Sequence, residues 1–165
     1  RAGIPVTGVG KIHDIFSGRG ISTDIHTEGN TDGMRRVIGQ ASGAGEGFVF
    51  TNLVDFDSHY GHRRDPAGYR AALEEFDASL GELLGHLRAS DLVFLTADHG
   101  TDPTHTGSDH TREYVPLLAL GPAVRAGTEL GTRSSFCDLG ASVEEAFGLT
   151  PLAPGRSFLS ELSPR

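Results

Sequence analysis

Acidic and histidine side chains that follow an apolar run of the sequence could together bind a divalent metal ion. Residues 91–95 predict a buried strand, and Asp98 and His99 come just after it. His110 follows at the end of a loop rich in Gly, Pro, Ser, Thr and Asp. Carboxylate and imidazole groups suit zinc or manganese, and strand ends are where ligands bind in open α/β folds. A polar loop after a strand is the alternative interpretation of this segment alone.

A second predicted strand upstream ends in the same residue types. Residues 48–54 are rich in β-branched and aromatic side chains, and Asp55, Asp57 and His62 follow them. Six of the eight histidines fall between His59 and His110, a clustering that a solvated surface explains poorly. Three of these could still be ordinary surface residues: His59, His86 and His105. Because a metal ion needs several ligand atoms aimed at one point, the two strand ends predict a metal site.

The elements that must position these residues alternate along the chain. Strands are predicted within residues 4–11, 48–54, 91–97 and 115–121, and helices over 12–16, 33–40 and 66–87 and after Ser134 or Ser135. The clearest helix starts at Asp65 and Pro66, an N-cap followed by proline at the first helical position. Residues 23–32 are predicted to form a polar loop, and the last helix is predicted to face inward through Leu139, Val143, Ala146 and Phe147. This order predicts an α/β sandwich around a mostly parallel sheet.

Length and composition fit one domain with an acidic surface. A chain of 165 residues is long enough to bury a core of its own. The net charge of −8 argues against a nucleic-acid partner, because neutralising phosphates needs clustered Lys and Arg. An acidic protein that acts on an anionic substrate usually relies on a local cation, and a bound metal ion is one.

The remaining compositional features predict a cytoplasmic protein. Cys137 is the single cysteine, which excludes an intramolecular disulfide and fits a reducing compartment; we expect it to be a small packing residue. No apolar run approaches the length of a membrane span, so no membrane partner is expected. The sequence starts on Arg1 without a signal peptide or an initiating Met, which suggests a fragment or a processed product.

Three motifs of the sequence are distinctive: Tyr-Gly-His-Arg-Arg at 60–64, Asp-His-Gly at 98–100 and Asp-His-Thr-Arg-Glu at 109–113. Together they closely resemble the phosphopentomutase family of the alkaline phosphatase superfamily. Asp-His-Gly alone would indicate only the superfamily, whereas the other two are specific. The resemblance covers nearly the whole chain and implies an alkaline-phosphatase-like core, a three-layer sandwich around a mostly parallel sheet.

The resemblance also implies an activity and a set of site residues. Family members are isomerases that interconvert ribose 1-phosphate and ribose 5-phosphate, or the deoxyribose pair, using two manganese ions and a phosphothreonine. By resemblance, Asp57, His62 and His110 bind one ion, and Asp98 and His99 bind the other. The family spacing favours Asp57 over Asp55. Lys11 stands at the position of a lysine near the sugar phosphate, whereas His59 and His105 match no ligand position.

The resemblance implies further that residues 1–165 are a single domain, the C-terminal part of the metal-binding core. Family members are more than twice as long, and their N-terminal part supplies another metal-binding Asp, the catalytic threonine and a sugar-binding cap. Other superfamily members, such as a cofactor-independent phosphoglycerate mutase or a phosphatase, share the metal core, but the motifs at 60–64 and 109–113 argue against them. A metal-binding chain without turnover is the other alternative, because double displacement cannot start without a nucleophile.

Overall fold

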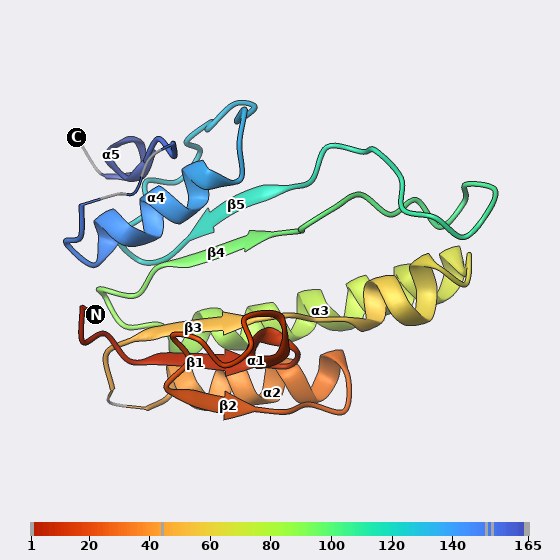
Figure 1. The fold of residues 1–165 in the computed structure, drawn as a ribbon, viewed down its shortest axis with the longest axis horizontal. Helices are drawn as coiled ribbons and strands as arrows, with labels where there is room; N and C mark the ends of the chain where they lie inside the picture. The colour runs from red at the N-terminus through yellow and green to blue at the C-terminus, as the bar shows by residue number, and fades with distance from the viewer. Residues whose placement is uncertain (1, 44, 151, 153, 164–165) are drawn as a thin grey trace. The chain divides into compact units, whose positions relative to one another are not determined.

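The computed structural model describes residues 2–43, 45–150, 152 and 154–163 (Figure 1). The chain divides into two compact units. Unit 1 contains Gly3–Leu87 and Ala97–Val115, and unit 2 contains Arg88–Thr96 and the described residues from Pro116 onward. Every residue predicted to bind metal or substrate belongs to unit 1.

A parallel three-stranded sheet organises unit 1. Its strands are β1 (Val6–Val9), β2 (Thr23–Ile25) and β3 (Phe48–Thr51), in the order β2-β1-β3. In the register of this sheet, Thr7 lies opposite Thr23 on one side and Val49 on the other. Because the strands are parallel, their carboxyl ends share one edge, and the segments that leave β1 and β3 start from that edge.

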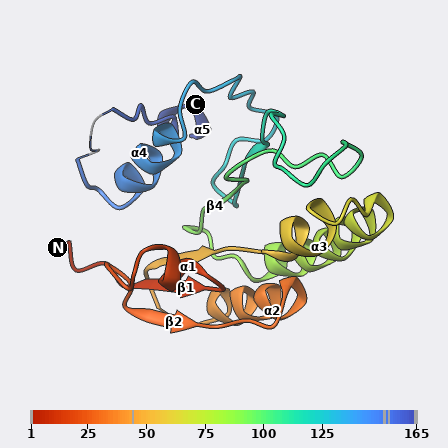
Figure 2. The same ribbon diagram turned by 45° about the vertical axis from the view of Figure 1, so that its right-hand side comes forward.

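Helices pack beside this sheet and supply most of the core of unit 1. They are α1 (Ile12–Ile15), α2 (Asn30–Ala41), the π-helix η1 (Phe56–Gly61) and α3 (Pro66–His86). Both views show α2 beside α3 (Figures 1 and 2). The Asp65 side chain caps α3 by accepting a hydrogen bond from the backbone N–H of Gly68. The buried hydrophobic side chains are Val9, Ile12, Met34, Ala72 and Leu83.

In the described part of unit 2, two strands pair antiparallel and two helices follow them. The strands are β4 (Val93–Thr96) and β5 (Leu117–Leu120), and the helices are α4 (Cys137–Ala146) and α5 (Leu159–Leu162). The fully buried Ser142 hydroxyl donates to the Asp138 carbonyl at 2.8 Å and accepts from the Phe158 N–H at 3.0 Å. This pair of hydrogen bonds ties α4 to the segment that leads into α5.

The structure confirms the α/β class, the parallel sheet and the start of α3 at Asp65 and Pro66. The predicted loop over residues 23–32 is wrong at both ends, because residues 23–25 form β2 by pairing with β1 and α2 already starts at Asn30. The predicted inward face of α4 is wrong at Ala146 and Phe147, which are exposed. Cys137 is exposed as well, so it is not the packing residue predicted.

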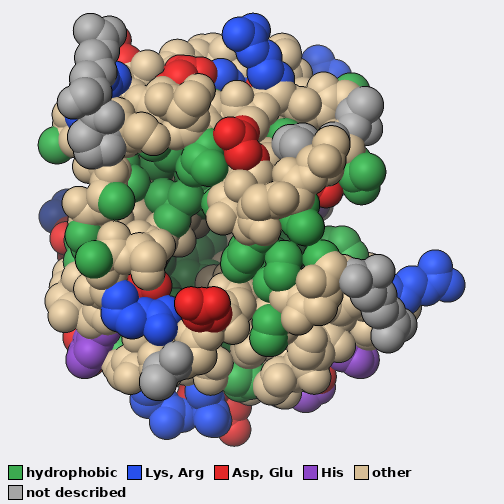
Figure 3. Space-filling view, turned by 90° about the vertical axis from the view of Figure 1, so that its left-hand side faces the viewer, with side chains coloured by type: hydrophobic (Ala, Val, Ile, Leu, Met, Phe, Trp, Pro, Cys, Tyr) green, Lys and Arg blue, Asp and Glu red, His purple; other side chains and the backbone are tan. Residues whose placement is uncertain are grey.

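The surface carries charge of both signs. On the face that Figure 3 shows, acidic and basic side chains are interspersed, and hydrophobic side chains also reach the surface. The acidic excess of the sequence is therefore not gathered in one patch on this face. None of the helices among the described residues combines the length and the apolar character that crossing a membrane requires.

Candidate metal centre

The π-helix η1 brings two of the predicted ligands together. Asp57 lies in η1 and His62 is its C-cap, and the His62 N–H donates to the Asp57 carbonyl at 2.9 Å, an i→i+5 hydrogen bond. In an α-helix, residues five apart point about 140° away from each other. The wider π turn returns them to one side, and the Nε2 atom of His62 lies 3.3 Å from Oδ2 of Asp57.

The segment 97–111 completes the cluster from another part of unit 1. Nε2 of His110 lies 3.5 Å from Oδ1 of Asp57 and 3.1 Å from Nε2 of His62. The rings of His99 and His110 stack with centroids 3.8 Å apart. Asp57, His99 and His110 each offer a ligand atom, and these three atoms lie within 4.8 Å of one another. The segments 56–62 and 97–111 therefore bring these side chains together, and the trio includes His99, which the resemblance assigned to a second ion.

The cluster fits a divalent ion in both distance and chemistry. Ligand atoms lie about 2.0–2.2 Å from zinc, so two ligands of one ion are separated by about 3–4 Å, which matches the pairs that Asp57 makes with His62 and His110. Nδ1 of His62 contacts the Ser108 carbonyl oxygen, which can only accept a hydrogen bond. A neutral His62 therefore keeps its proton on Nδ1 and turns the Nε2 lone pair toward the cluster.

Thr101 and Gly61 hold the two halves of the cluster in contact. The Thr101 hydroxyl donates to Oδ1 of Asp57 at 3.3 Å and lies 3.2 Å from Nδ1 of His99. Gly61 is buried, and a Cβ there would stand 2.2 Å from the Thr101 methyl carbon. Only glycine at position 61 lets the 97–111 segment approach η1 this closely.

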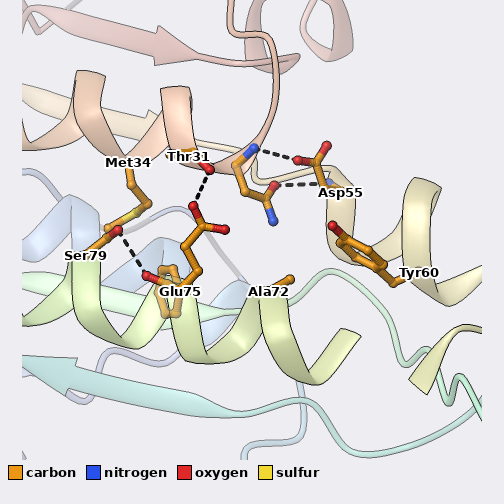
Figure 4. Close-up of a pocket in the computed structure, with 9 residues that line it drawn as sticks. Thr31, Met34, Asp55, Tyr60, Ala72, Glu75 and Ser79 are labelled. Carbon is orange, nitrogen blue, oxygen red and sulfur yellow. Dashed lines mark hydrogen bonds between the residues drawn. The ribbon is translucent and has the colours of Figure 1, made fainter. Parts of the chain in front are cut away.

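Asp55 has a different task from Asp57. Its Oδ2 atom accepts from the Asn30 N–H at 2.7 Å, and its own N–H donates to Oδ1 of Asn30 at 3.0 Å. These bonds fix the start of α2 beside a small cavity of about 70 Å³, which Tyr60 and Glu75 also line (Figure 4). The Asp55 carboxylate is thus engaged by Asn30, away from the cluster.

Like His62, the predicted site residues Asp98 and Lys11 lie outside the group formed by Asp57, His99 and His110. The Asp98 side chain is 80% exposed, with Oδ1 3.8 Å from Nε2 of His99. Lys11 is exposed at the N-cap of α1, two residues after β1, at the same sheet edge from which the chain leaves β3 toward Asp57. His59 and His105 are exposed, and Nδ1 of His59 lies 3.4 Å from Oδ1 of Asp55.

Two pKa values near the cluster are shifted. Burial raises the pKa of the Tyr69 hydroxyl, and the negative charge of Asp57 raises it further. The Thr104 hydroxyl and then the Thr104 N–H donate to the Asp102 carboxylate, and these bonds hold the pKa of Asp102 below its usual value. The Asp102 carboxylate, near the start of the loop between His99 and His110, therefore stays charged.

Two residues at the quoted motifs had no role in the sequence prediction. Thr101 follows the Asp-His-Gly motif and bridges Asp57 and His99. Arg64 closes the Tyr-Gly-His-Arg-Arg motif and donates to three backbone carbonyls of the 97–111 segment. Their positions beside or inside these motifs were the available signal, but neither contact can be read from residue types.

Comparison with known proteins shows the family of the chain. The family model for the metalloenzyme superfamily matches residues 6–151. The chain belongs to the metalloenzyme superfamily. Asp57, His62, Asp98, His99 and His110 all fall inside the range that matches this superfamily.

Curated relatives are named phosphopentomutase. The protein from Alkaliphilus metalliredigens (strain QYMF) is 52% identical over 157 residues, 95% of this chain and 40% of the relative. The protein from Anaeromyxobacter sp. (strain K) is 55% identical over 162 residues, 98% of this chain and 41% of the relative. The protein from Clostridioides difficile (strain 630) is 45% identical over 161 residues, which are 98% of this chain and 41% of the relative. The chain thus spans about two fifths of the length of these relatives.

Proposed function

We propose that this chain forms part of the metal-binding core of a phosphopentomutase, an isomerase that moves a phosphoryl group between C1 and C5 of ribose or deoxyribose phosphate. One observation carries the proposal: an Asp–His cluster of metal-ligand geometry lies in a chain about 50% identical over nearly its whole length to proteins of that name. The activity is proposed for a protein that also has the part of the relatives' sequence that this chain does not cover.

In this proposal, Asp57, His62 and His110 bind one ion, and Asp98 and His99 contribute to a second. Manganese is the proposed ion, in a cytoplasmic enzyme of nucleotide metabolism. When bound, two divalent ions neutralise the charge that develops on a transferring phosphoryl group. Asp98 is exposed and can turn toward an ion without breaking a packed contact.

The residues of the chain have separate tasks around the sugar phosphate. The Asp57 carboxylate supplies negative charge that balances a divalent ion, and His62 presents an unprotonated Nε2 because its Nδ1 contacts the Ser108 carbonyl. Lys11 would place an ammonium group beside the phosphate from the sheet edge that also leads to Asp57. The acidic chain thereby gains local positive charge where an anionic substrate must bind.

A chimeric enzyme tests the activity. The matching 162 residues of the Anaeromyxobacter sp. (strain K) protein would be replaced by this chain, and conversion of ribose 1-phosphate to ribose 5-phosphate would be followed by ³¹P NMR with manganese. The expected result is turnover with the pentose phosphate and none with 3-phosphoglycerate. A folded chimera that turns over only 3-phosphoglycerate would contradict the proposal, as would near-normal mutase turnover by its Asp98→Ala variant.

A further inference from the structure

Arg64 has a backbone conformation that few residues other than glycine adopt. Its φ is 54°, in the left-handed region, and Ser17 is the other such non-glycine residue in the part of the chain that the structure describes. A side chain as long as arginine persists in this region only where its surroundings stabilise it. The contacts of the guanidinium group explain why Arg64 remains there.

The guanidinium group of Arg64 binds one loop at three points. Nη1 donates to the Asp102 carbonyl at 2.7 Å, Nε donates to the Gly107 carbonyl, and Nη2 donates to the Asp109 carbonyl. These carbonyls lie at the start and near the end of the loop before His110. Arginine suits this task because its donors are held in a rigid planar fork.

This loop carries the groups that orient two of the proposed ligands. The Ser108 carbonyl, between two of the bound carbonyls, contacts Nδ1 of His62. His110 directly follows Asp109, whose carbonyl Arg64 holds. We propose that Arg64 is a positioning residue, which fixes the 102–109 loop so that Nε2 of His62 and Nε2 of His110 present their lone pairs to one metal ion. This inference rests on the proposed metal centre.

Two simpler explanations of Arg64 make different predictions. If only its charge mattered, lysine would replace it, but an ammonium group cannot reach three carbonyls that diverge along a loop. If only its left-handed turn mattered, glycine would serve better. Its neighbour Arg63 is a matched control, because it is exposed and has no hydrogen-bond or ion-pair partner among the described residues.

Titration with Co²⁺, followed by its visible absorption, tests the metal-binding part of the inference on the purified protein. We expect Arg64→Lys and Arg64→Gly each to bind Co²⁺ about 10–100-fold more weakly, as is typical when a partner of a ligand is lost. Arg63→Lys should stay within about twofold of the wild type. Wild-type affinity in Arg64→Lys or in Arg64→Gly would overturn the positioning role.

Amide hydrogen exchange of the metal-free protein tests the loop itself. We expect amides within residues 102–110 to exchange faster in Arg64→Lys and Arg64→Gly than in the wild type and Arg63→Lys, with α3 unchanged as a check of folding. Unchanged exchange in the loop would overturn the proposed role of Arg64 in fixing the loop, whatever the Co²⁺ titration shows. A wild type that binds no Co²⁺ would overturn the proposed metal centre and the metal-binding part of this inference, while the exchange data still decide whether Arg64 orders the loop.

Discussion

Nε2 of His62 lies 3.3 Å from Oδ2 of Asp57, although the two residues are five positions apart in a helical segment. The i→i+5 hydrogen bond between their backbones makes this possible, since an α-helical turn would direct the two side chains away from each other. The π turn is therefore part of the site and not an irregularity of the chain that follows β3.

Gly61 is expected to tolerate no side chain. In Gly61→Ala the new Cβ would stand 2.2 Å from the Thr101 methyl carbon and 3.0 Å from the Phe56 carbonyl oxygen, so overpacking should lower the free energy of unfolding by about 1–3 kcal/mol. Gly81→Ala is the control, because a Cβ at this exposed position of α3 meets no atom within 4 Å. This substitution should raise the free energy of unfolding by about 0.5–1 kcal/mol. Urea unfolding measures both; an unchanged midpoint in Gly61→Ala would contradict the close approach.

Thr101 is expected to support the ligands through its hydroxyl. Thr101→Val keeps the shape of the side chain but removes the bonds to Asp57 and His99, and we expect metal affinity to fall about tenfold. Thr101→Ser retains the hydroxyl and should recover most of this loss. Isothermal titration with Mn²⁺ compares the three proteins, and equal affinity in Thr101→Val would show that the hydroxyl has no such role.

Tyr69 is expected to limit stability at alkaline pH. Because burial and then the charge of Asp57 raise its pKa in the folded protein, its contribution to stability is fully present below the unfolded pKa of about 10. That contribution is lost as the pH rises through the folded pKa, since ionisation then favours the unfolded chain. Tyr69→Phe should therefore lose less stability above about pH 10 than the wild type. Denaturant midpoints at pH 8 and pH 10.5 test this, and parallel losses in both proteins would contradict it.

Ser142 is expected to matter for stability and not for metal binding. Ser142→Ala leaves the buried Phe158 N–H without its acceptor, which should cost about 1–3 kcal/mol. The exposed Ser160→Ala in α5 should change stability by less than about 0.5 kcal/mol. Mn²⁺ affinity should be unchanged in both folded variants, because Ser142 belongs to unit 2 and the cluster to unit 1. A loss of affinity in Ser142→Ala would show that the cluster depends on unit 2.

Sequence patterns predicted the elements whose signals are local. The N-cap and proline at Asp65 and Pro66 specified where α3 starts. Residue types predicted a metal site where two strands end, and Asp57, His99 and His110 are candidates among the residues there. In contrast, β2 consists of Thr23, Asp24 and Ile25, and these residues form a strand because they pair with β1. Pairing of this kind is a tertiary effect that a local pattern does not contain.

The supporting structure of the site was also beyond sequence patterns. Nothing in the run 56–61 distinguishes a π turn from an α turn, yet the turn decides whether Asp57 and His62 meet. The left-handed φ of Arg64 is equally invisible, because arginine seldom adopts it. Residue types therefore named the candidate ligands, while backbone geometry decided which of them lie together.

The most direct test of the metal centre is the manganese content of the purified protein after dialysis, measured by elemental analysis. The wild type and the exposed-histidine control His105→Ala should retain at least one ion per chain, whereas Asp57→Asn, which removes the carboxylate shared by His62 and His110, should retain none. A wild type without manganese, or an Asp57→Asn protein with as much manganese as the wild type, would contradict the account.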